Sequence, residues 1–221
     1  MKLMTQRHKI VQDIIRQRKT RKVLADPMNP VNWTDQQLAA GDDLVQQAIR
    51  DCGWAPFHYD RKQDGLAEPW RAYWMDCSSC RRMATSVREV VPNLKPGAKL
   101  PALLAGCGSL TLFTWLPQSP GDGADSAKLQ RVNREHLAAT AAAVQNFLLL
   151  LTAHDLPNYW SSGTLIADHY FDKLGIPASQ QLAAAVFVHY PQAAGDFEMV
   201  GGKQRDNRST DCRWLKKISW A

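Results

Sequence analysis

The residues best suited to chemistry form the segment Asn158-Tyr159-Trp160-Ser161-Ser162-Gly163. Trp160 supplies a flat aromatic ring, Ser161 and Ser162 supply small hydrogen-bond donors, and Gly163 lets the backbone approach a ligand closely. This combination suits a planar, phosphorylated cofactor. From the residues alone, Trp160 is better read as a core residue than as a cofactor contact.

A buried helix must position this segment. Apolar residues recur at helical spacing from Glu135 to His154, and the stretch Phe147 to Leu151 is apolar on every face. Asp155-Leu156-Pro157 then turns the chain before the segment begins. A short helix is expected after it, from Ile166 to Lys173.

Basic residues gather at both ends of the chain. Residues 1–22 hold eight Lys or Arg and one acid, and residues 203–217 hold six Lys or Arg and two acids. The remainder holds 13 basic and 18 acidic residues, a net charge of −5. Two solvated basic termini would produce this pattern. So would two ends that meet around one anionic ligand. No nucleic-acid-binding motif is present, so nucleic acid is not an expected partner.

The five cysteines are an odd number in a chain without a visible export signal, which favours free thiols in the reducing cytoplasm. The close pair Cys77-Ser78-Ser79-Cys80 lacks the second pair that zinc would need, so no metal site is expected. A thioredoxin-like redox role would require this pair at the start of a helix that follows a strand. The alternative is two buried or half-buried structural thiols.

The other predicted elements mix helices and strands without strict alternation, which favours an α+β fold in one domain spanning 1–221. Helices are expected at Gln6–Arg18, Thr34–Asp51 and Cys77–Val91, and strands at Pro69–Met75, within Ala102–Leu116 and at Leu182–Tyr190. The longest apolar run, Pro101 to Pro117, is too short to span a membrane and reads as one or two buried strands. The basic tail, about 201–221, carries Trp214 and Trp220 and is expected to pack on the body or on a second subunit.

Taken in order, these segments resemble the nitroreductase family of flavin enzymes. Arg18-Lys19-Thr20-Arg21-Lys22-Val23-Leu24 resembles the family's amino-terminal pattern Arg-Arg-Ser-x-Arg-x-Phe, which holds the flavin phosphate and ribityl chain. The resemblance implies that FMN is bound by Arg18, Lys19, Thr20 and Lys22. Lys203-Gln204-Arg205 resembles the element that closes over the phosphate, which adds Lys203 and Arg205.

Two further segments carry the resemblance. Trp54-Ala55-Pro56-Phe57-His58 is similar to the family's Ala-Pro-Ser/Asp segment, which reaches the flavin from the second subunit, so Trp54 and His58 are implied as cofactor contacts. Trp160-Ser161-Ser162-Gly163 is similar to the turn beside the flavin ring, so all four are implied there. Glu68 replaces the family's Gln before Pro69-Trp70, and the loop before it is longer than in the family.

The resemblance implies a nitroreductase-like α+β fold, with a central mixed or antiparallel sheet flanked by helices, in an intertwined homodimer that binds FMN. The implied reaction is ping-pong: NAD(P)H reduces the flavin, and a small electron-poor acceptor (a nitroaromatic, quinone or enone) takes the electrons. No protein acid or base is assigned. Two alternatives stay open. One is a flavin-dependent dehydrogenase, dehalogenase or flavin-modifying enzyme of the same family. The other is a non-catalytic basic binding protein that has lost the flavin.

Overall fold

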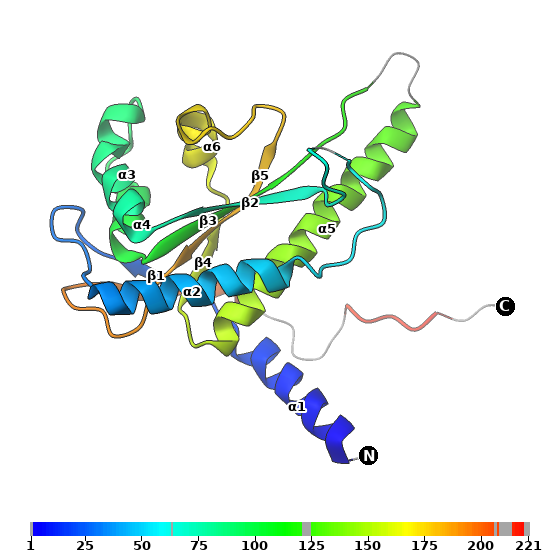
Figure 1. Ribbon diagram of the computed structural model, residues 1–221, viewed down its shortest axis with the longest axis horizontal. Coiled ribbons are helices and arrows are strands. Elements are labelled where there is room, and N and C mark those ends of the chain that lie inside the picture. Colours follow the sequence, from blue (N-terminus) through cyan, green and yellow to red (C-terminus); the bar gives the residue numbers. More distant parts are fainter. Residues whose placement is uncertain (1, 63, 121–124, 206, 208–213, 219–221) are drawn as a thin grey trace.

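An antiparallel four-stranded sheet forms the centre of the molecule (Figure 1). The computed structural model describes residues 2–62, 64–120, 125–205, 207 and 214–218, without the side chains of residues 2–4 and 205. The strand order is β2-β3-β5-β4. The strands are β2 Trp70–Met75, β3 Ser109–Trp115, β5 Gln181–Val188 and β4 Asn158–Ser161.

Helices cover both faces of this sheet, which confirms the predicted α+β class (Figure 1). One face, which includes Leu110 and Phe187, packs against α3 Cys77–Val90, α4 Leu100–Gly106 and α6 Thr164–Tyr170. Alternate residues of a strand point to opposite faces. Phe113 and Val186 therefore pack on the other side, against α2 Asp35–Cys52 and α5 Ser126–Ala153.

Local capping fixes the starts of the predicted helices. The Thr34 hydroxyl accepts a hydrogen bond from the Gln37 N–H at 3.3 Å, and the Gln37 side chain accepts one from the Thr34 N–H at 2.8 Å. This reciprocal capping box starts α2 where the sequence predicts. The Asp76 carboxylate accepts from the Ser79 N–H at 2.7 Å and starts α3 directly after β2.

The prediction for the apolar run from Pro101 to Pro117 is wrong in its first half. That half forms the helix α4, and only β3 is a strand. A short continuous apolar run has no periodicity that separates a buried helix from a buried strand. Pro101 stands in the first turn of α4, where its missing N–H costs nothing.

The boundaries of helices α5 and α6 also differ from the predictions. Helix α5 starts at Ser126, nine residues before the predicted Glu135, because Asp125 caps it by accepting from the Ala127 N–H at 2.9 Å. Helix α6 starts two residues before Ile166 and ends at Tyr170, and a 3-10 turn, η1 Asp172–Leu174, follows it.

A second, two-stranded sheet joins the ends of the chain. β1 Arg21–Leu24 pairs antiparallel with β6 Glu198–Gly201, and the turn η2 Lys203–Arg205 follows β6. The two basic ends therefore meet, while the anionic ligand expected between them stays a prediction. β6 is absent from the predictions because its four residues hold a single β-branched side chain, Val200.

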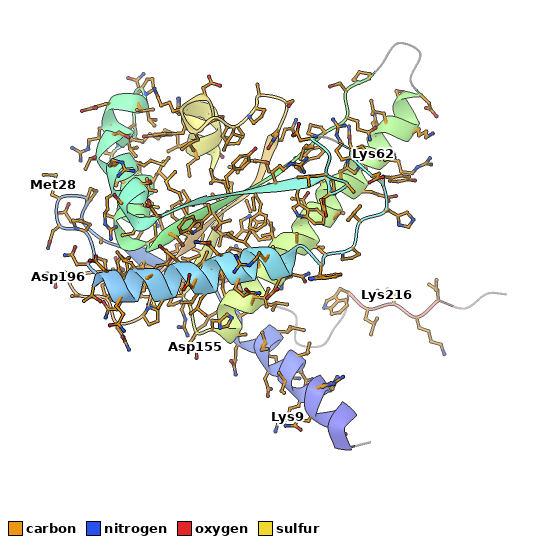
Figure 2. All side chains as sticks on the ribbon, in the orientation of Figure 1. Lys9, Met28, Lys62, Asp155, Asp196 and Lys216 are labelled. Atoms are coloured by element: carbon orange, nitrogen blue, oxygen red, sulfur yellow. The ribbon has the colours of Figure 1, made fainter. Side chains whose placement is uncertain are left out.

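The terminal segments project from the body. Helix α1 Lys2–Gln17 touches α5, and both Lys9 on α1 and Lys216 near the carboxyl end lie outside the sheet layers (Figure 2). Trp214 is 73% exposed, so this part of the tail does not pack on its own chain. By length and composition α5 could cross a membrane. Its buried face instead packs on the sheet, as a core helix of a soluble protein does.

Candidate cofactor site

A basic cavity of about 590 Å³ lies between the two-stranded sheet and β4. Four of its described lining residues are cations and none is acidic, so it attracts anions. The lining residues, named together as the basic cavity, are Arg18, Thr20, Lys22, Lys99, Tyr159, Val200, Gly201, Gly202, Lys203 and Gln204.

A smaller cavity of about 190 Å³ adjoins the basic cavity, because Lys99 and Tyr159 line both. We call it the serine cavity, since three hydroxyls and a glycine form one of its walls and apolar side chains form the rest. Its remaining lining residues are Leu100, Leu103, Ser161, Ser162, Gly163, Thr164, Leu165, Ile166 and Phe187.

The pairing of β1 with β6 builds the basic cavity. Arg21 lies opposite Gly201, so the residues before Arg21 face those after Gly201. The Gly202 N–H donates to the Thr20 carbonyl at 3.3 Å. A Cβ on Gly202 would come within 2.8 Å of the Thr20 Cβ, so no larger residue fits there without a shift. This close approach brings Arg18 and Lys203 to one cavity.

An aromatic pair supports the junction of the two cavities. The Tyr159 ring stacks on the Phe187 ring, with centroids 6.2 Å apart and planes 19° apart. The Lys22 Nζ lies 4.7 Å from the centroid of the Tyr159 ring, within the range of a cation–π contact. Tyr159 thus links a cation of β1 to the core of the sheet.

The turn after β4 is held in a conformation that suits glycine. The Ser161 hydroxyl accepts from the Gly163 N–H at 3.3 Å. Gly163 has a φ of +66°, and a Cβ there would lie 2.6 Å from Leu182 Cδ2 and 2.8 Å from Ala185 Cβ. The glycine therefore lets the backbone run against β5 while both serines border the cavity.

Lys99 was not found by sequence reasoning, although it lines both cavities. It stands directly before α4, and the Arg81 guanidinium anchors the other end of α4 by donating to the Leu104 and Ala105 carbonyls. Pro101 could have marked this helix start and so drawn attention to Lys99. Tyr159 is also absent from the predicted site residues, because the family resemblance begins at its neighbour Trp160.

The structure brings most of the predicted site residues together. Lining one or other cavity are Arg18, Thr20, Lys22, Lys203, Ser161, Ser162 and Gly163. Lys19 is exposed and lines neither cavity. Arg205 ends η2, but its side chain lies outside the described part of the chain.

Trp160 is not at either cavity, because strand alternation turns it to the other face. It pairs with Val186, which packs against α2 and α5, whereas Tyr159 pairs with Phe187 on the α4 side. The Trp160 side chain is 40% exposed. Its contact with the flavin stays a prediction, which the lining of these two cavities does not support.

Trp54 and His58 lie away from both cavities. Their loop follows α2, and Phe57 within it packs edge-on against Trp70, with centroids 5.7 Å apart. Trp70 pairs with Trp115 at one end of β3, whereas Tyr159 and Phe187 lie level with Leu110 at the other end. Trp54 is 88% exposed and His58 is exposed, so both are open to a partner.

The cysteine pair stands where a redox motif would stand, at the start of α3 directly after β2. Its chemistry differs. Burial raises the pKa of Cys77 to about 11, and burial with its thiol neighbour Cys107 raises the pKa of Cys80. Reactive Cys-x-x-Cys pairs instead have a lowered pKa. In the described ranges, no three His, Cys, Asp or Glu side chains are grouped to hold a metal.

Several solved structures share this fold. A nitroreductase-like family protein from Bacillus cereus superposes with a TM-score of 0.64 at 19% identity, over 95% of this chain and 96% of that one. A proposed nitroreductase from Desulfovibrio desulfuricans, in complex with FMN, gives 0.55 at 18% identity, over 96% and 98%. The NADPH:FMN oxidoreductase of Vibrio harveyi, complexed with NAD+, gives 0.52 at 15% identity, over 82% and 69%.

No protein-family model and no curated protein matches the chain. At these identities the likeness to solved structures establishes the fold. The chain has the nitroreductase-like fold.

Proposed function

We propose that this chain binds FMN across the basic and serine cavities and passes electrons from NAD(P)H to a small electron-poor molecule. One observation carries the proposal: Lys99 and Tyr159 join a cavity lined by cations to one lined by hydroxyls and a glycine. A phosphate needs charge-assisted donors from several directions. The cations come from β1 and the residues before it, from the start of α4 and from η2.

The residues present fit the cofactor. Arg18, Thr20 and Lys203 would hold the phosphate, with Lys19, Lys22 and Arg205 as further candidates from the same segments. Ser161, Ser162 and Gly163 would lie beside the ring. The close approaches of Gly202 to Thr20 and of Gly163 to Leu182 and Ala185 shape the walls of the two cavities, and larger residues would displace those walls.

When bound, FMN would supply the hydride and electron chemistry, and the protein would bind and orient it. A ping-pong reaction with a nitroaromatic, quinone or enone acceptor remains part of the proposal. The FMN bound to the Desulfovibrio protein and the NAD+ bound to the Vibrio protein support the choice of cofactors. A reducing, cytoplasmic setting would suit this chemistry and the free thiols.

We further propose a homodimer, each copy a single domain over 1–221, in which Trp54 and His58 reach the partner's cofactor. Within one chain they lie at the far end of β3 from the cavities. Trp54, Trp214, Leu215 and Ile218 leave large apolar surfaces exposed, which an obligate interface would cover. Phe147 and Leu151 of α5 are buried in their own chain, so the apolar stretch of this helix does not bear on the dimer.

The deciding experiment is reconstitution with FMN. The purified protein should be yellow or become yellow with FMN, and anaerobic NAD(P)H should bleach the bound flavin. A colourless protein that neither binds FMN nor gains thermal stability from it would favour the non-catalytic binding protein. Sedimentation velocity should show a dimer, and a folded, FMN-loaded monomer at low concentration would contradict the shared site.

A further inference from the structure

Building on the proposed function, we infer that Tyr159 is a positioning residue that holds the Lys22 ammonium at the junction of the two cavities. The geometry that supports this is a three-part stack. The Lys22 Nζ lies 4.7 Å from the Tyr159 ring centroid, and the Tyr159 ring lies on Phe187, which is 4% exposed.

The Tyr159 ring is held in place by its contact with the buried Phe187 ring. Tyr159 and Phe187 are directly opposite in the β4–β5 register, and Phe187 belongs to the core packed by α3, α4 and α6. The tyrosine ring therefore cannot move far without disturbing the sheet. Lys22 comes from β1, in the separate two-stranded sheet, so the contact also ties the two sheets together at the cavity.

Electrostatics explain why Lys22 needs such a contact. Lys22 shares the basic cavity with Arg18, Lys99 and Lys203, and no acid is among the described lining residues. A lysine has a strongly hydrated charge on a flexible stem, so repulsion favours its escape to solvent. The negative face of an aromatic ring offsets this repulsion without neutralising the charge.

This position distinguishes Lys22 from a residue that binds only phosphate. Tyr159 lines both cavities, so a cation over its ring lies where the phosphate end and the ring end of the cofactor meet. Loss of the positioned cation should therefore weaken riboflavin as well as FMN. Loss of a phosphate contact should weaken FMN alone.

A double-mutant cycle in flavin binding tests the inference. Tyr159→Leu removes the aromatic face, Tyr159→Phe keeps it, and Lys22→Met removes the charge. Tyr159→Leu should weaken both flavins about 2- to 30-fold, the equivalent of one cation–π contact. Tyr159→Phe should bind both flavins as tightly as the wild type. In a protein that already carries Lys22→Met, Tyr159→Leu should not lower the flavin affinity further. Equal losses in both backgrounds would overturn the inference, because the ring would then act independently of Lys22.

A measurement without cofactor separates this inference from the proposed function. Reductive methylation with isotopically labelled formaldehyde keeps the lysine charge and gives each lysine an NMR signal. The Lys22 signal, assigned with Lys22→Met, should be shifted upfield by the Tyr159 ring and lose that shift in Tyr159→Leu. If the Lys22 signal is shifted but the protein binds no flavin, only the proposed function is contradicted. If the protein binds FMN but the Lys22 signal is not shifted, only the positioning role of Tyr159 is contradicted.

Discussion

Gly202 and Thr20 approach so closely that a Cβ on Gly202 would come within 2.8 Å of the Thr20 Cβ. Gly202 follows β6 and Thr20 precedes β1, so this approach sets how near the two ends of the chain lie. Arg18 and Lys203, the proposed phosphate ligands, lie beside it in the basic cavity. The spacing of the cations is therefore set by a backbone contact rather than by the cations themselves.

Gly202→Ala should consequently weaken FMN binding, because the new methyl group must push Thr20 away. Overpacking of this kind costs about 1–3 kcal/mol. If all of this free energy is lost from FMN binding, the affinity for FMN falls roughly 5- to 150-fold. Gly201→Ala is the comparison variant, since Gly201 lines the same cavity but a Cβ there would meet no protein atom within 4 Å. Fluorescence titration with FMN compares the two, and equal affinities would refute the role of the close approach.

Gly163→Ala should destabilise the fold more than Gly175→Ala. Both glycines have a left-handed backbone, with φ of +66° and +68°, so both changes carry the same conformational cost of about 1–2 kcal/mol. Only Gly163 adds a clash, with Leu182 and Ala185, whereas Gly175 has open space around its Cβ position. The difference between the melting temperatures of the two variants measures the cost of the clash. Equal melting temperatures would mean that Leu182 and Ala185 of β5 shift to accommodate the added methyl group without cost.

The sequence predicts the elements that carry local signals and misses those that depend on distant partners. Thr34 with Gln37 marks α2, and Asp76 marks α3, because each cap is complete within one turn. β6 is too short and too polar to be recognised alone, and it becomes a strand only by pairing with β1. The sequence of α4 predicts a strand, because a short buried apolar run has no periodicity that separates a helix from a strand.

The candidate site also contains residues that a local motif marks and residues that only the packing of distant segments brings to it. Arg18, Thr20 and Lys22 could be predicted because their contiguous run resembles the family's amino-terminal pattern. Lys99 could not, because only packing of α4 brings it beside Tyr159. The family resemblance implies Trp160 at the site, but the alternation of β4 places Tyr159 at the two cavities instead.

The Cys77 and Cys80 thiols should be dispensable for turnover, even though they begin a helix after a strand. Burial raises the pKa of Cys77 to about 11, so at neutral pH this thiol is protonated and a poor nucleophile. The double change Cys77→Ser/Cys80→Ser should leave NAD(P)H reduction of bound flavin intact in stopped-flow absorbance. A folded, FMN-loaded double variant whose flavin is no longer reduced would show that the pair takes part in the reaction.

The cap at Asp76 should make stability depend on pH in the acid range. Hydrogen bonds from Ser79 lower the pKa of Asp76 in the folded protein. Its stabilisation is then present above the unfolded pKa of about 3.9 and is lost as pH falls through the lower folded value. Asp76→Ala should cost about 1 kcal/mol in urea unfolding at neutral pH. The difference in free energy of unfolding between Asp76→Ala and the wild type should become smaller in strong acid, where Asp76 is protonated. Asp168→Ala, exposed within α6, should not cause this loss, and a pH-independent Asp76 effect would contradict the cap's charge dependence.

Arg18 provides the sharpest test of the phosphate assignment, because it lines the basic cavity together with three other cations, which jointly attract an anion. A hydrogen bond to a charged group contributes about 1.5–3 kcal/mol. At about 1.4 kcal/mol per tenfold, Arg18→Ala should weaken FMN binding roughly 10- to 150-fold. The loss should shrink sharply for riboflavin, which lacks the phosphate. Arg82→Ala is the matched control, since Arg82 is exposed on α3 and bonds the Ser78 and Ser79 hydroxyls away from both cavities. If the two variants bind FMN equally, or if Arg18→Ala weakens riboflavin just as much, the basic start of the chain is a solvated surface and the phosphate lies elsewhere.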